Sequence, residues 1–145
     1  MKSNRIADLF RRERDLNRAI RRKEEWYHEL VEAAISTGAF RYDPTPKSDS
    51  SPSGSRHERL VIKYNEIEEE IDMLKAERDK VTEQIVMLIS KLPPRERRVM
   101  KARHVDHDTV ESIMKRFGLT YQTYKQYHSQ AMKRMELNLD NIYQT

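Results

Sequence analysis

Polar side chains that could bind DNA bases gather just after a glycine-containing turn in the last third of the chain. The stretch YQTYKQYHS, residues 121–129, contains two glutamines, a lysine and several hydroxyl groups, and no acidic residue. Glutamine can bind adenine N6 and N7 with two hydrogen bonds, and lysine can reach guanine O6 and N7. If this segment lies in a major groove, the candidate base-reading residues are Tyr121, Gln122, Thr123, Lys125 and Gln126.

Basic and hydroxyl side chains around this stretch could hold DNA phosphates. Contacts to phosphate oxygens orient a protein on the duplex without carrying sequence information. Residues 92–145 hold ten basic and six acidic side chains, a net charge of +4, whereas residues 60–91 carry −3. A basic C-terminal module of this kind indicates a polyanionic partner. The candidate phosphate ligands are Arg95, Arg98, Lys115, Arg116, Thr120 and Ser129, with Lys133 and Arg134 as further basic groups nearby.

Other kinds of chemistry are not indicated. The chain has no cysteine, which excludes disulfides, cysteine-ligated zinc and a thiol nucleophile. His104, Asp106, His107 and Asp108 lie close together around a connector, but no second group of ligands accompanies them. The other histidines, including His128, are isolated in the sequence. We therefore expect no enzyme activity, no cofactor and no metal.

Two long segments have the apolar spacing of helices that pair with each other. In residues 2–37 apolar side chains recur every three or four positions, with interruptions at Glu13 and Lys23. In the second segment the 4-3 heptad spacing runs from Leu60 to Leu92 and is broken only by Arg78. Residues 1–92 are thus predicted to form a long antiparallel helical hairpin, a coiled coil with a flexible loop over residues 41–57. Pairing between two chains is the alternative. The apolar positions are Ile6, Leu9, Leu16, Ile20, Tyr27, Leu30 and Ala34, then Leu60, Tyr64, Ile67, Ile71, Leu74, Val81, Ile85, Leu88 and Leu92.

Shorter helices are predicted over residues 93–145. Pro93 and Pro94 end the second long helix, and Pro94 suits the first position of a helix over residues 94–104. Thr109 can cap a helix over residues 110–117, Gly118 can end it, and Thr120 can cap a final helix over residues 120–137. The inner stripe of that last helix is Tyr124, Tyr127, Ala131, Met132 and Met135. Helix, glycine turn and polar helix together predict an all-α chain that ends in a helix-turn-helix.

The C-terminal segment resembles region 4 of the bacterial sigma-70 factors. The resemblance covers residues 88–137 and rests on LISKLPPRERRVMKARHVD, on TVESI in the first helix of the pair, on FGLT in the turn, and on AMKRM at the end. The whole chain is similar in architecture to small phage regulators of the ArpU/RinA type, which place long helices ahead of a sigma-4-like end. The resemblance implies a DNA-binding transcriptional regulator, phage or prophage encoded, that controls late or packaging genes.

Two other functions remain open from the sequence. A small terminase-like DNA-packaging protein also joins a helix-turn-helix to helical oligomerisation segments, and a coiled-coil adaptor would not bind DNA at all. The expected partners are double-stranded DNA together with a second copy of the chain, as a homodimer, or RNA polymerase. No apolar run reaches membrane-spanning length, so no membrane partner is expected. The expected location is the cytoplasm of a bacterial host cell, in association with the nucleoid.

Overall fold

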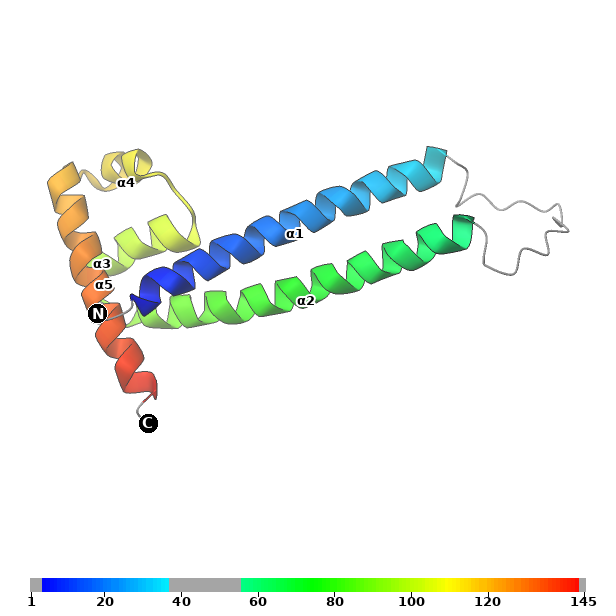
Figure 1. Cartoon of the computed structure of the whole chain (residues 1–145). Coiled ribbons are helices and arrows are strands. Elements are labelled where there is room, and N and C mark those ends of the chain that lie inside the picture. Colours follow the sequence, from blue (N-terminus) through cyan, green and yellow to red (C-terminus); the bar gives the residue numbers. More distant parts are fainter. Residues whose placement is uncertain (1–3, 37–55, 144–145) are drawn as a thin grey trace, which may run out of the picture. The chain divides into compact units, whose positions relative to one another are not determined.

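The computed structural model describes residues 4–36 and 56–143, which form helices and no strand (Figure 1). The predicted all-α class is confirmed. The predicted loop over residues 41–57 lies outside the described residues, except that Arg56 and His57 already belong to a helix. The elements are α1 (Arg5–Ser36), α2 (Arg56–Ser90), α3 (Pro94–Met100), the π-helical turn η1 (Lys101–Val105), α4 (Val110–Phe117) and α5 (Tyr121–Tyr143).

The chain divides into two compact units. The hairpin unit is Asp15–Glu77, and the helix-turn-helix unit combines Met1–Arg14 with Arg78–Thr145. Helices α1 and α2 therefore each contribute one part to each unit. The predicted division into residues 1–92 and 93–145 cuts the chain at another place and stays a prediction.

In the hairpin unit α1 and α2 run antiparallel. Tyr27 contacts Tyr64 through a hydrogen bond between their hydroxyl groups, and Lys23 Nζ lies 2.6 Å from Glu70 Oε2. The bond to Tyr64 raises the pKa of Tyr27 to about 12. This ion pair accounts for the charged side chain of Lys23 at a position where the spacing predicts an apolar one. A coiled coil in the strict sense stays a prediction. The buried apolar side chains of this unit are Leu16, Ile20, Ala34, Ile67 and Ile71.

The turn of the helix-turn-helix is built as the sequence predicts. Thr109 caps α4, because its side chain accepts a hydrogen bond from the Ser112 N–H at 3.2 Å. Gly118 ends α4 with φ 64°, a left-handed conformation that costs glycine little. Thr120 caps α5 by accepting from the Thr123 N–H at 3.2 Å. These local bonds fix where α4 stops and where α5 starts.

One apolar cluster holds α3, η1, α4 and α5 together. Its buried members are Val99, Ala102, Ile113 and Tyr124, one from each of these elements. Ile113 is fully buried, and the predicted inner positions Ala131 and Met135 of α5 are fully buried as well. Five partly buried side chains complete the cluster: Val110, Met114, Phe117, Leu119 and Tyr127.

The helix predicted over residues 94–104 differs from the one observed. After Met100 the backbone widens into η1, where the Asp106 N–H donates to the Lys101 carbonyl at 3.0 Å. His107 then takes φ 58°, a left-handed conformation that ends the helical path. The wide turn keeps Ala102 buried in the core.

The beginning of α1 belongs to the core of the helix-turn-helix unit. Asn4 caps α1 through a hydrogen bond from the Ala7 N–H at 3.1 Å. Ile6 is fully buried, and Phe10 is 6% exposed. The prediction placed Leu9 on the apolar seam; the structure buries Phe10 and leaves Leu9 only half-buried. Phe10 takes this place because its ring stacks on the imidazole of His104, with ring centroids 3.7 Å apart.

Helix α5 continues to Tyr143, beyond the predicted end at residue 137. Two features hold these extra turns in place. Leu139 is buried, and Arg5 of α1 forms ion pairs with Glu136, at 2.7 Å, and with Asp140. The longer α5 is thus explained by contacts with a segment far away in the sequence.

Candidate nucleic-acid interface

The first turns of α5 present a polar face on the side opposite the core. Gln122, Gln126 and Ser129 are exposed, whereas Tyr124 is buried and points to the apolar cluster. Positions 122, 126 and 129 share one helix face because they are three or four residues apart. Two of the five candidate base-reading residues, Gln122 and Gln126, therefore stand at the centre of this face.

The other candidate base-reading residues lie at the edge of this face or serve the cap. Lys125 Nζ lies 5.4 Å from the ring centroid of Tyr121, which is 55% exposed. This cation–π contact places both side chains beside the glutamines. Thr123 is half-buried, and its hydroxyl is 2.8 Å from the Thr120 hydroxyl. The hydrogen bonds of Thr120 and Thr123 thus fix the start of α5.

Three of the candidate phosphate ligands come together at one hollow. Arg95 and Arg98 of α3 and Arg116 of α4 line it. Arg116 also lies 3.5 Å from Asp108, so part of its charge is already compensated. Lys115 and Ser129 are exposed outside the hollow. The apolar floor between the arginines consists of Val99, Phe117, Leu119 and Tyr127.

Arg134 serves the fold, although the sequence suggested it as a nearby basic group for phosphate. Its Nε donates to Glu96 Oε1 at 3.1 Å, and Glu96 is only 3% exposed. A buried carboxylate is costly unless it is paired, so this bond stabilises the contact between α3 and α5. Sequence reasoning missed the pair because its members are 38 residues apart.

Neutralising the arginines of the hollow is expected to weaken DNA binding without changing its sequence preference. Arg95→Ala or Arg98→Ala should lower the slope of log K against log salt by about one unit, because one phosphate contact is lost. The measurement is the Kd for a duplex over a series of salt concentrations. Arg21→Ala is the matched control, since Arg21 is exposed in the hairpin unit. An unchanged slope in both arginine variants would place the phosphate contacts elsewhere.

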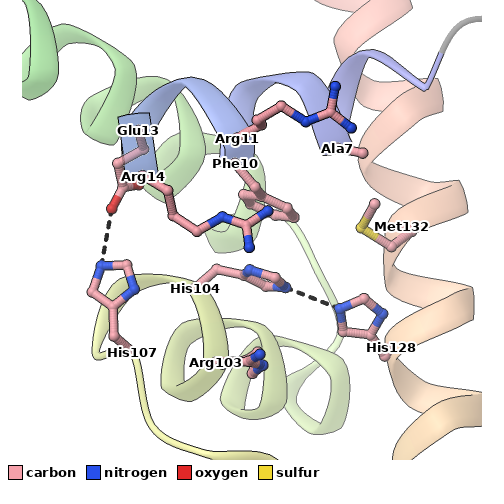
Figure 2. A pocket seen from close by; sticks show the side chains of 10 residues that line it. All are labelled: Ala7, Phe10, Arg11, Glu13, Arg14, Arg103, His104, His107, His128 and Met132. Carbon is pink, nitrogen blue, oxygen red and sulfur yellow. Dashed lines mark hydrogen bonds and ion pairs between the residues drawn. The ribbon is translucent and has the colours of Figure 1, made fainter. Parts of the chain in front are cut away.

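Two histidines beside this face share a hydrogen bond, as Figure 2 shows. Their Nε2 atoms, one on η1 and one on α5, are 2.9 Å apart in His104 and His128. Burial, together with the neighbouring ring of His128 and the positive charge of Arg103, lowers the pKa of His104 to about 3. Burial also lowers the pKa of His128. Both rings are therefore neutral at pH 7, and His128 is not isolated as its sequence position had indicated.

This pair makes the stability of the helix-turn-helix unit depend on pH. As the pH falls from about 6.5 towards 3, the unfolded chain binds a proton at His104 that the folded chain does not. The contribution of His104 to the free energy of unfolding then falls by about 1.4 kcal/mol per pH unit. In His104→Gln the slope should fall by the contribution of His104, whereas His28→Gln, at an exposed position, should keep the full slope. Urea unfolding at pH 7, 6 and 5 measures the difference, and equal slopes for all three proteins would contradict the assignment.

Comparison with known families identifies the same part of the chain. Residues 82–135 match the family described as Sigma-70, region 4. This span contains the end of α2, all of α3, η1 and α4, and the first turns of α5. The chain thus carries a sigma-70 region 4 domain, a helix-turn-helix DNA-binding fold, which indicates a DNA-binding regulator. Neither a curated protein nor a solved structure matches the chain.

The structure describes residues 4–36 and 56–143, and two features are absent from these ranges. None of the helices in these ranges has the length and apolarity needed to cross a membrane. In the same ranges no three histidine, aspartate or glutamate side chains are grouped as metal ligands would be.

Proposed function

We propose that this protein is a transcriptional regulator that reads promoter DNA with α5 in the major groove. The observation that carries the proposal is the exposure of Gln122 and Gln126 directly after the capped turn, inside a sigma-70 region 4 domain. A recognition helix contacts base edges with its N-terminal residues, and these are the positions concerned. The hollow lined by Arg95, Arg98 and Arg116 supports the proposal, because it offers phosphate contacts next to α5.

The regulator is phage or prophage encoded and acts on late or packaging genes in the bacterial cytoplasm, on the nucleoid. The support for this part is the resemblance of the whole chain to regulators of the ArpU/RinA type. In this proposal α5 and the arginines bind DNA, and no residue has a catalytic, cofactor or metal role.

The regulator binds its site as a homodimer, with RNA polymerase as the alternative partner. A single helix-turn-helix buries roughly 600–1,000 Å² of protein surface and contacts few base pairs. Two half-sites or a second protein supply the additional binding energy that a genomic site requires. Residues 66–83 are rich in acidic side chains, which disfavour contact with DNA and leave this stretch for a protein partner.

Genome-wide capture of DNA by the purified full chain, combined with its mass in solution, tests the proposal. Enrichment of promoter fragments by a dimer, with two-fold related half-sites, is the expected result. A large ring-like oligomer bound near packaging genes would instead indicate a terminase-like packaging protein. If the protein retains no fragment in a salt-dependent manner, it is an adaptor and the proposal is wrong.

A further inference from the structure

A cavity of ≈ 220 Å³ lies inside the helix-turn-helix unit, away from the phosphate hollow. Its wall combines the first turns of α1 with η1, the turn after η1, and α5. In Figure 2, Arg14, His104 and His128 come from three different elements and face the space beside Phe10. Sites for drug-sized molecules take roughly 300–1,000 Å³, so this cavity suits a small ligand such as a tetrahedral oxyanion.

The wall of the cavity is strongly cationic. Arg11 and Arg14 reach it from α1 and Arg103 from η1. Burial lowers the pKa of His104 most, and the neighbouring His128 and the charges of Arg103 and Arg14 lower it further. Arg103 is already engaged, because its NH1 donates to the Asp108 carbonyl at 3.2 Å. Arg11 lies 3.8 Å from Asp8 and its side chain is 68% exposed. Arg14 points towards His104 in Figure 2, so it is the arginine that can donate to a ligand in the cavity.

Glu13, a single carboxylate, stands in the same wall and is 4% exposed. Its Oε1 shares a hydrogen bond with His107 Nε2 at 3.1 Å. Its Oε2 is buried and has no hydrogen-bond partner in the described part of the chain. A buried acceptor of this kind calls for a donor. The Glu13 carboxylate repels an anion that has no proton. It accepts a hydrogen bond from an anion that carries a proton.

We propose that this cavity binds a phosphate group that carries one proton, with Arg14 donating to its oxygens and Glu13 accepting from its P–OH. Free hydrogen phosphate and the protonated form of a phosphomonoester share this chemistry. A phosphodiester has no such proton, so the DNA backbone is not the ligand. The site is lined by residues of α1, η1 and α5. A bound phosphate would therefore lie next to the helix proposed to read DNA, where it could act as a small-molecule signal.

Anion titrations of the full chain test the proposal at constant ionic strength and pH 7. The histidine ring resonances in NMR spectra provide the readout, because His104 and His128 line the cavity. Inorganic phosphate should give saturable shifts, and sulfate, which has no proton at this pH, should bind about tenfold or more weakly. AMP distinguishes the two sources: tighter binding of AMP indicates a phosphomonoester, and tighter binding of phosphate indicates the free ion.

Two substitutions locate the binding site. Arg14→Gln should weaken phosphate binding about tenfold or more, whereas Arg18→Gln, the same change at an exposed position of the hairpin unit, should not. Glu13→Gln keeps an acceptor for His107 and adds an N–H donor, so it should weaken phosphate binding and strengthen sulfate binding. The reversal of preference is specific to the proposed contact, since a merely unfolded variant would bind neither anion.

Several outcomes would overturn the proposal. They are shifts that never saturate, equal affinities for phosphate and sulfate in the unchanged protein, and equal effects of Arg14→Gln and Arg18→Gln. The fourth outcome combines two results: the Arg14→Gln variant loses salt-dependent duplex binding, and the unchanged protein does not bind phosphate. Arg14 would then contact DNA instead of a phosphate ligand. Failure of the proposed DNA-binding function would leave the phosphate titration unaffected, so the two proposals fail separately.

Discussion

The double variant Gln122→Ala, Gln126→Ala is expected to lose about 2–6 kcal/mol of binding free energy at a selected site, a loss of at least about 30-fold in affinity. Each glutamine can form one bidentate contact with a base, and each such contact discriminates by about 1–3 kcal/mol. Both side chains are exposed on the polar face of α5, so their removal leaves the core unchanged. The measurement compares Kd values for a site obtained by capture and for random duplex at one salt concentration.

The double variant has a matched control and a clear contrary result. Gln84→Ala removes an exposed glutamine from α2, away from α5 in sequence, and should leave both Kd values unchanged. Binding of random duplex should hardly change in the double variant, because phosphate contacts dominate nonspecific affinity. Equal losses of affinity for the selected site and for random duplex would show that these two residues do not read bases.

Phe10→Ala is expected to lower the free energy of unfolding of the helix-turn-helix unit by about 3–5 kcal/mol. Phe10 is 6% exposed, and its ring is parallel to that of His104 within 3°. Truncation removes a large apolar side chain and leaves a cavity between α1 and η1. Far-UV circular dichroism during urea unfolding measures the loss.

Trp26→Ala is the aromatic control on the same helix. Trp26 is 42% exposed and belongs to the hairpin unit, so its truncation should cost less than about 1 kcal/mol. A cost below about 1 kcal/mol for Phe10→Ala as well would mean that residues 5–14 do not complete the core of the helix-turn-helix unit. A loss confined to the Phe10 variant supports a place for Phe10 in the core of the helix-turn-helix unit.

Local signals predicted the turn of the helix-turn-helix. A threonine at an N-cap accepts a hydrogen bond from the backbone N–H three residues later and marks where a helix starts. A glycine after an amphipathic segment marks where a helix stops. The caps at Thr109 and Thr120 and the left-handed Gly118 follow from such signals. The all-α class followed from the spacing of apolar residues in the same way.

Contacts between distant segments could not be predicted from spacing alone. Leu9 and Phe10 both fit the three- and four-residue steps that start at Ile6, and only the fold decides which of them is buried. The polar residue Glu13 at an apolar position was a visible signal. Its partner His107 is 94 residues away, however, and nothing in the sequence connects the two. The His104–His128 pair and the cavity that it lines could not be predicted for the same reason, because their residues are far apart in the sequence.

The position of residues 5–14 in the fold determines when, during synthesis on the ribosome, the helix-turn-helix unit can be completed. Arg5 and its partner Glu136 are 131 residues apart, so α1 leaves the ribosome long before α5 exists. Contacts of such separation form late, after loop closure over most of the chain. A nascent or prematurely terminated chain that lacks α5 therefore exposes Ile6 and Phe10 and lacks the helix proposed to read DNA. The unit that binds DNA is complete only when translation has passed the last turns of α5.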